Sequence, residues 1–229
     1  MTHVLQVEQI GKSYLQGRHR REVLKEVSMN VVSGELTLIC GPSGCGKSTL
    51  LAIASGLLRP DRGRIFALGE DIWSNDLAAV ERFRLQHTGF IFQHCNLFPA
   101  LQAWEQVALP LHYLGLSERD GRTRAEEVLQ QVGLSARIRC RPSEMSGGEQ
   151  QRVSIARALA KLPQFIFADE PTSALDAANG AIVIDTLRQL AHKSATLVLC
   201  VSHDARLIDH ADRILMIEDG CILSDRRIA

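Results

Sequence analysis

Residues 41–49 read GPSGCGKST and match the pattern G-x-x-x-x-G-K-[ST] in full. The apolar run ELTLIC (35–40) precedes them, and apolar residues at helical spacing follow over residues 47–56. A strand, a glycine-rich turn and a helix in this order form an anion cradle, because backbone N–H groups and the positive end of the helix face the ligand. The sequence therefore predicts a nucleotide phosphate site at this turn.

Individual residues of this turn have distinct predicted roles. Lys47 adds a mobile positive charge for catalysis and phosphate binding, and the Ser48 hydroxyl is placed to coordinate Mg²⁺. The turn therefore predicts a nucleotide and Mg²⁺ as its ligands. The other nucleotide-binding positions predicted in the turn are Gly41, Ser43, Gly44, Cys45, Gly46 and Thr49.

A second motif, FIFADE (165–170), is an apolar run that ends in two carboxylates. Asp169 is the predicted metal partner, acting through water. Glu170 projects differently from the strand end, and we predict that it holds the attacking water in line with the γ-phosphate. Capping of the following turn is the structural alternative for Glu170. Both motifs occur in many nucleotide hydrolases, so they indicate nucleotide use without its purpose.

Length and composition favour one large globular domain, since the chain has 229 residues, 45% hydrophobic and 23% charged. The nearly continuous apolar runs at 35–40, 164–168 and 196–201 are typical of strands buried on both faces of a parallel sheet. Helical spacing of apolar residues over 148–161 and 179–192 completes an α/β pattern.

The segment 96–141 differs from this pattern. Its part ERDGRTRAEEVLQQV (118–132) is charged, with a helical apolar stripe and no strand-like run. We interpret the segment as an inserted helical subdomain. The predicted division of the single domain 1–229 is an α/β core with a β subdomain over 1–93 and 156–229, and a helical subdomain over about 94–155.

Charge and hydropathy exclude several classes of protein. Lys+Arg and Asp+Glu balance at 26 each, so no basic field indicates a nucleic-acid partner. The longest apolar stretch, 50–58, is far short of the roughly 18 residues that span a bilayer, and the N-terminus has no basic segment followed by an apolar one. The six cysteines form no CxxC pair, as expected for reduced thiols. We expect a cytosolic chain.

Residues 145–159 read MSGGEQQRVSIARAL, and here the chain resembles the ABC ATPase family, whose signature is LSGGQ followed by a basic amphipathic helix. Met145 replaces the usual Leu with similar volume. Ser146, Gly147 and Gly148 open the helix and form a second anion cradle, with Glu149 next in the motif. The resemblance implies a P-loop NTPase fold with a RecA-like, mostly parallel sheet core, an antiparallel β subdomain and an inserted ABC-type α-helical subdomain.

In this family, the resemblance implies, the signature of one protomer closes on the γ-phosphate bound to the P-loop of the other. Two ATP molecules then sit between two subunits, either a homodimer or a pair with a sister cassette. Closing and reopening of the dimer drives a separate integral-membrane permease subunit, which would place the chain peripherally on the inner face of the cell membrane.

Further positions match the family one by one. Tyr14 matches the aromatic residue that stacks on adenine, a contact worth roughly 1–3 kcal/mol per base. Gln93, in GFIFQ, matches the glutamine that touches Mg²⁺ and ATP and links the core to the helical subdomain. His203, in VSHD, matches the switch histidine that contacts the γ-phosphate during catalysis. Residues 173–176 (SALD) match the loop at the dimer interface, where Asp176 also suits a helix cap.

The stretch 82–111 and the YLQG…EVL pattern starting at Tyr14 resemble the subgroup of lipoprotein-release, macrolide-export and cell-division ATPases. Its members pair with a four-helix membrane protein that has a large domain across the membrane. Residues 102–104 (QAW) and Ser173-Ala174 depart from the subgroup's usual Thr-Ala-x and Gly-Asn, which leaves the ATPase chemistry intact. Phe98, Leu101 and Trp104 are predicted to offer an apolar coupling surface, and burial within the subunit is the alternative.

Three functions follow from these patterns. The first is an ATPase that powers a membrane partner for export or for lipoprotein and periplasmic mechanotransmission. The second is an ATPase that regulates a membrane-linked cell-wall or cell-division complex without transport. The third, a non-transport ABC protein of DNA repair or translation, is disfavoured because the sequence has neither a long coiled coil between its motifs nor a second cassette.

Overall fold

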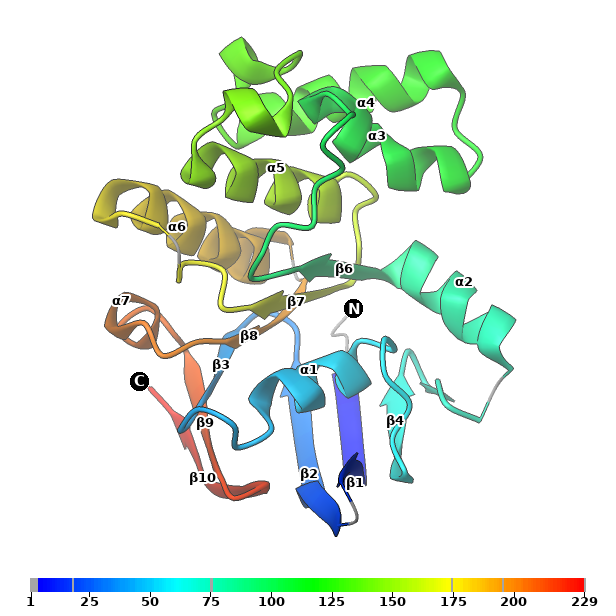
Figure 1. Cartoon of the computed structure of the whole chain (residues 1–229), viewed down its shortest axis with the longest axis vertical. Helices are drawn as coiled ribbons and strands as arrows, with labels where there is room; N and C mark the ends of the chain where they lie inside the picture. The colour runs from blue at the N-terminus through cyan, green and yellow to red at the C-terminus, as the bar shows by residue number, and fades with distance from the viewer. Residues whose placement is uncertain (1–3, 18, 75, 174, 195, 229) are drawn as a thin grey trace.

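The computed structural model describes residues 4–17, 19–74, 76–173, 175–194 and 196–228. Within them, two sheets form, with the strand orders β10-β9-β3-β8-β7-β6 and β2-β1-β4-β5 (Figure 1). The strands are β1 (Val4–Gln16), β2 (His19–Val32), β3 (Leu36–Cys40), β4 (Arg62–Ala67), β5 (Glu70–Asp71), β6 (Thr88–Ile91), β7 (Phe165–Asp169), β8 (Leu197–Val201), β9 (Arg213–Glu218) and β10 (Cys221–Arg227).

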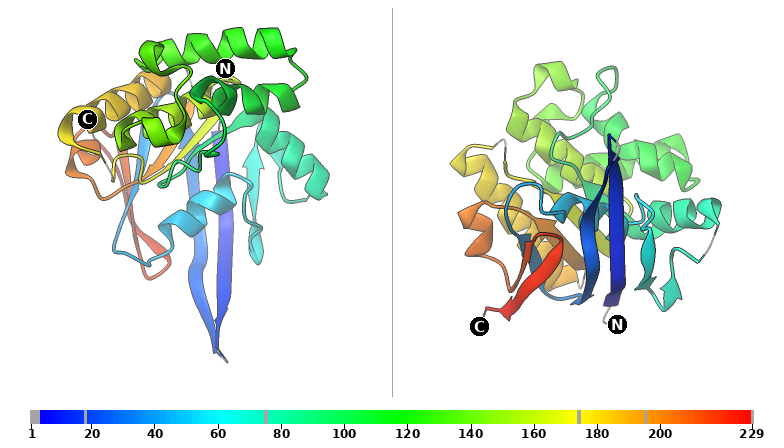
Figure 2. Two further views of the ribbon diagram at one scale, coloured as in Figure 1. Left: turned by 45° about the horizontal axis from the view of Figure 1, so that its top comes forward. Right: turned by 60° about the horizontal axis from the view of Figure 1, so that its bottom comes forward.

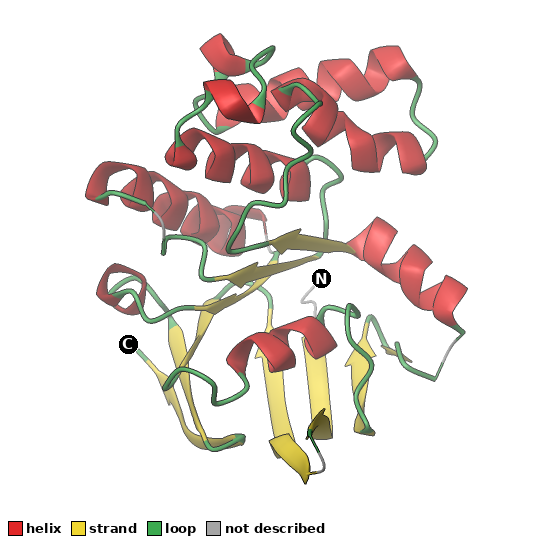
Figure 3. Ribbon diagram, in the orientation of Figure 1, coloured by secondary structure: helices red, strands yellow, loops and turns green. Residues whose placement is uncertain are grey.

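The helices gather mainly at the end of the molecule away from the antiparallel sheet (Figure 3). The described helices are α1 (Lys47–Ala54), α2 (Leu77–His87), α3 (Ala103–Tyr113), α4 (Glu118–Gln131), α5 (Gly147–Leu159), α6 (Ala177–Ser194) and α7 (Ala205–Ile208), with short 3₁₀ turns at Ser135–Arg137 and Pro142–Glu144. No helix in the described part of the chain is long and apolar enough to cross a membrane.

The larger sheet is mostly parallel, as the apolar runs predicted. β6, β7, β8, β3 and β9 pair in parallel, and only β10 pairs antiparallel. Phe165 and Phe167 of β7 face one apolar cluster, and Ile166 and Ala168 face another. Because the carboxyl ends of parallel strands meet at one edge, the loops after β3, β7 and β8 converge there.

The antiparallel sheet adds a long hairpin to this core. β1 and β2 pair from Val4↔Val32 to Gln16↔His19, and the left view of Figure 2 shows the hairpin projecting beyond the other strands. Tyr14 lies near its tip, paired with Arg21. The predicted fold class is confirmed in both its mostly parallel core and its antiparallel sheet.

The helices α3, α4 and α5 pack together at the opposite end (Figure 1). Val107, Val128 and Val153, one from each helix, are fully buried in a cluster that continues to the parallel sheet. The predicted boundary between residues 155 and 156 falls inside the continuous helix α5. The exact subdomain boundaries therefore stay a prediction.

The ends of two helices differ from their predicted positions for local reasons. The helix predicted over 47–56 ends at Ala54, where Gly56 adopts a left-handed φ of 82°. The helix predicted over 179–192 begins at Ala177, because Asp176 Oδ1 accepts the backbone N–H of Asn179 at 2.8 Å and so caps the first turn.

Candidate active site

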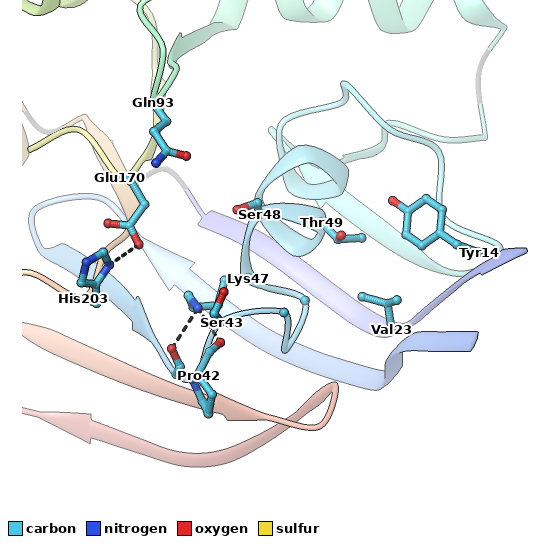
Figure 4. A pocket seen from close by; sticks show the side chains of 13 residues that line it. Tyr14, Val23, Pro42, Ser43, Lys47, Ser48, Thr49, Gln93, Glu170 and His203 are labelled. Carbon is cyan, nitrogen blue, oxygen red and sulfur yellow. Dashed lines mark hydrogen bonds and ion pairs between the residues drawn. The ribbon is translucent and has the colours of Figure 1, made fainter. Parts of the chain in front are cut away.

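A cavity of about 690 Å³ lies at the carboxyl edge of the parallel sheet (Figure 4). Its walls come from the hairpin, the loop before α1, the loop after β6, the end of β7 and the loop after β8. It is lined by Tyr14, Val23, Gly41, Pro42, Ser43, Gly44, Gly46, Lys47, Ser48, Thr49, Gln93, Glu170 and His203. The structure thus brings most of the predicted site residues together.

The glycine-rich loop leaves the start of α1 open. Gly46, the residue before the helix, has a φ of 104°, and a Cβ there would lie 2.7 Å from the Val23 carbonyl oxygen. Only glycine fits this conformation and this close approach. No side chain caps α1, so its first backbone N–H groups are available to an anion in the cavity.

Lys47 stabilises the curl of this loop. Its Nζ donates to the carbonyl oxygens of Gly41 at 2.9 Å and of Pro42 at 2.8 Å (Figure 4). The positive charge therefore lies over the loop, at the point where phosphates would be held. Cys45 lies beneath, 8% exposed, with its Sγ 3.9 Å from Nζ, and it does not line the cavity.

Ser48 and Asp169 face each other from α1 and β7. The Ser48 hydroxyl donates to Asp169 Oδ1 at 2.9 Å. Burial raises the pKa of Asp169, and the hydrogen bond from Ser48 opposes that rise. A hydroxyl, a carboxylate and the nearby Gln93 amide supply the oxygen ligands that Mg²⁺ prefers. Mg²⁺ usually keeps several waters and binds through one or two protein groups together with substrate phosphates, and Ser48, Asp169 and Gln93 fit that pattern.

Glu170 is held on both carboxylate oxygens. His203 Nδ1 lies 2.8 Å from Oε1 (Figure 4). The Ser202 hydroxyl donates to Oε2 at 3.2 Å. Glu170 also has a left-handed φ of 47°, which is uncommon for a residue with a side chain and is often found at functional sites. The carboxylate faces the cavity in a fixed position, whereas the His203 side chain is 73% exposed.

The signature residues lie outside this cavity. Ser146 caps α5, since its Oγ accepts the Glu149 N–H at 3.3 Å and Glu149 Oε2 accepts the Ser146 N–H at 2.8 Å. Arg137 Nε donates to the other Glu149 oxygen at 2.8 Å. The Ser146 N–H bond, followed by Arg137, lowers the pKa of Glu149. The Glu149 carboxylate is therefore fully engaged within its own chain.

The two signature glycines differ in their surroundings. A Cβ on Gly148 would lie 2.6 Å from Asn179 Cγ at the start of α6. A Cβ on Gly147 would meet no atom within 4 Å. Packing inside the chain therefore accounts for Gly148, but it does not account for Gly147.

Several residues of the site were not predicted from the sequence. Val23 lines the cavity with Tyr14, but the register shifts of the hairpin between Ile10 and Ser13 leave no pattern that would place it there. Pro42, whose carbonyl oxygen accepts from Lys47, and Ser202, which donates to Glu170, were missed as well. In the predicted 173–176 loop, Ala174 lies outside the described residues, and Asp176 forms the predicted helix cap.

These features define a nucleotide-binding cassette of the P-loop class: an uncapped helix start, a lysine over the loop and an oriented carboxylate at a strand end. The family model described as ABC transporter matches residues 24–173. The chain belongs to the ABC transporter family, as predicted, and its predicted class of enzyme, an ATPase, is confirmed with it.

Curated relatives and solved structures agree with this assignment. The macrolide export ATP-binding/permease protein MacB 1 of Aeromonas hydrophila is 43% identical over 98% of this chain, which spans only 34% of that relative's length. An ABC transporter ATP-binding protein of Thermotoga maritima, uncharacterized by its description, is 42% identical over 97% of this chain and 94% of its own length. The ATP-binding cassette MJ0796, in a dimeric post-hydrolysis state bound to ADP and Pi, matches with a TM-score of 0.93 and 35% identity over 98% of this chain and 99% of that one.

Proposed function

We propose that this chain is the ATP-binding and ATP-hydrolysing subunit of an ABC transporter and that it powers a membrane-spanning partner. The observation that carries the proposal is the placement of Glu170, held by His203 and Ser202, opposite the loop with Lys47 in one cavity. This arrangement suits in-line attack of water on a terminal phosphate.

Each residue has a role in the proposed reaction. The N–H groups of the 41–49 loop and Lys47 bind the phosphates, and Tyr14 stacks on the adenine. Ser48, Gln93 and, through water, Asp169 would hold Mg²⁺, which supplies charge for the phosphate oxygens. Glu170 accepts a hydrogen bond from the attacking water, and His203 keeps Glu170 oriented and reaches the γ-phosphate.

A second copy of the chain, or a sister cassette, completes each site in this proposal. The open space at Gly147 and the start of α5 suit a phosphate brought by a partner. The dimeric state of MJ0796 with ADP and Pi supports this assembly. MgATP would close two chains head to tail, and hydrolysis would reopen the dimer.

A groove between α2 and α3 suits the membrane partner. It has a volume of about 380 Å³ and exposes Phe98 and Tyr113, whose exposed fractions are 52% and 70%. The predicted surface is thus partly open: Phe98 lines the groove, while Trp104 is half-buried against the helical core and donates its indole N–H to Gln102 Oε1 at 2.8 Å. We propose that an amphipathic helix of a membrane-spanning partner docks here and keeps the chain on the inner face of the membrane.

The relatives support export as the use of this power. The MacB relatives, including the one 43% identical, are named for macrolide export, and a Pseudomonas syringae relative, 42% identical, is named for probable syringafactin export. The cargo class we propose is therefore an amphiphilic molecule handled through a partner of the macrolide-export type. The alternative function is regulation of a cell-wall complex, and the following experiment distinguishes it from export.

The test is recovery of the partner with a tagged Glu170→Gln chain from solubilised membranes in MgATP. We expect one membrane-spanning protein to co-purify and to be lost when Phe98→Asp is added. Leu223→Asp, which changes an exposed leucine on β10, is the matched control and should keep the partner. Recovery of a cell-wall hydrolase regulator would replace export by regulation, and recovery of no membrane protein would contradict the proposal.

A further inference from the structure

The guanidinium of Arg206 joins three segments beside the active site. Arg206 lies on α7, three residues after His203. Its Nε and Nη2 donate to the Asp204 carboxylate at 2.6–3.1 Å, which forms a forked contact. Its Nη1 donates to the backbone carbonyl oxygens of Asp176 at 3.3 Å and Ala177 at 3.4 Å. Arg206 therefore links the histidine loop to the first turn of α6.

Gly180 leaves the space that this contact needs. A Cβ on Gly180 would lie 2.8 Å from Arg206 Cζ, so the guanidinium rests against the bare backbone of α6. Gly180 is buried and lies inside a regular helix, where glycine is unfavourable relative to alanine. A side chain at position 180 would therefore displace the Arg206 guanidinium from this contact.

Asp204 connects Arg206 to the segment that follows β7 and contains Glu170. Its Oδ2 accepts the Thr172 hydroxyl at 2.7 Å, two residues after Glu170. Its backbone N–H donates to the Ser202 hydroxyl at 3.1 Å, and that hydroxyl donates to Glu170 Oε2. The Arg206 hydrogen bonds are the main cause that lowers the pKa of Asp204 to about 2.

We propose that Arg206 is a positioning residue for ATP hydrolysis, because its guanidinium is forked on Asp204 and also holds Asp176 and Ala177 in place relative to His203 and Glu170. The inference rests on the roles proposed above for those two residues. A shift of Asp176 and Ala177 would reach the catalytic carboxylate through Arg206 and Asp204. A purely structural Arg206 would lower the unfolding temperature when replaced, whereas a positioning residue lowers kcat while the unfolding temperature and the KM stay close to those of the wild type.

Steady-state ATPase measurements on four variants test this proposal. Arg206→Gln should lower kcat about five- to tenfold and leave the KM for MgATP within about twofold, since it alters orientation and not binding. Arg206→Lys should be intermediate, because it keeps the charge but loses the fork. Gly180→Ala should lower kcat in the same direction by displacing the guanidinium, while alanine holds or raises the unfolding temperature. Arg188→Gln, an exposed site further along α6, is the control and should match the wild type.

Two results would overturn the assignment: kcat within about twofold of wild type for both Arg206→Gln and Gly180→Ala, or losses that follow a lowered unfolding temperature or a raised KM. The proposed catalytic roles are tested in parallel with Glu170→Gln and His203→Ala. If those two variants stay active, the active-site proposal fails. If they are inactive while Arg206→Gln is fully active, only the role of Arg206 fails.

Discussion

The two anion cradles of the chain are built differently. The loop at 41–49 opens into a cavity that also holds Gln93, Glu170 and His203, so five segments of one chain meet around it. The start of α5 lies outside that cavity, and its capping residues Ser146 and Glu149 bond to each other. Candidate catalytic residues lie beside the first cradle, and none of them lies beside the second. The difference implies that one folded chain carries halves of two different sites.

The largest expected effect is the loss of ATP hydrolysis when Glu170, beside the first cradle, is replaced. Glu170→Gln keeps the shape of the side chain and one accepting oxygen but removes the base. We expect kcat to fall at least about 100-fold, or about 2.7 kcal/mol of barrier, with little change in ATP affinity. Phosphate release under saturating MgATP measures it, with the exposed Glu218→Gln as control. Turnover near the wild-type rate would remove Glu170 from the mechanism.

Lys47→Ala should act earlier, on nucleotide binding. The substitution removes a charge-assisted contact to phosphate and also frees the carbonyl oxygens of Gly41 and Pro42. We expect the Kd for ATP to rise at least about tenfold, since charged hydrogen bonds contribute about 1.5–3 kcal/mol. Titration calorimetry measures it. Unchanged affinity would show that the loop binds phosphate without the lysine.

Substitution of the two signature glycines should distinguish an effect on stability from an effect on dimer assembly. Gly148→Ala places a methyl group against Asn179, and we expect a loss of about 1–3 kcal/mol of unfolding free energy. Gly147→Ala meets open space, so its unfolding free energy should stay within about 1 kcal/mol of wild type. Its ATPase rate should nevertheless fall several-fold. Denaturant unfolding and ATPase assays compare the pair, and a fully active Gly147→Ala chain would mean that no partner approaches there.

The smallest effect concerns the hairpin that carries Tyr14. Asp61 accepts hydrogen bonds from Lys12 and from the Ser13 N–H, both at 2.9 Å, and from Arg20; the Lys12 bond is the main cause that lowers the pKa of Asp61 from 3.8 to about 2. A lowered folded pKa gives stability above pH 3.8 that is lost as pH falls towards 2. Asp61→Asn should flatten the acid dependence of unfolding in that window by less than about 1 kcal/mol. An unchanged acid profile would mean that the hairpin is held by its backbone pairing alone.

The residues of the active site could be predicted from the sequence more completely than the residues that hold them in place. Motifs such as GPSGCGKST and FIFADE contain the reactive residue types at a fixed spacing. Lys47, Ser48 and Glu170 could therefore be assigned to the site from the sequence alone. The forked contact of Arg206 gave no such signal, because it joins residues about 30 positions apart and depends on the missing side chain of Gly180. Val23 depended on a strand register with irregularities that local pattern does not encode.

The position of the signature motif in the fold could not be predicted from the local sequence pattern either. Its motif predicted a helix start and an anion cradle, and α5 does begin at Gly147 with Ser146 as its cap. Its distance from the first cavity follows from the packing of α3, α4 and α5 at the far end of the molecule, which depends on contacts distant in sequence.

The central claim is that two chains share each ATP site, and the most direct measurement is the mass of the Glu170→Gln chain in solution with and without MgATP. We predict a dimer, with two ATP bound, that forms only with nucleotide and is weakened when Gly147→Ala is added, while each monomer still binds ATP at its own 41–49 loop. A chain that stays monomeric with ATP bound, or a dimer that forms equally well with Gly147→Ala, would contradict the account.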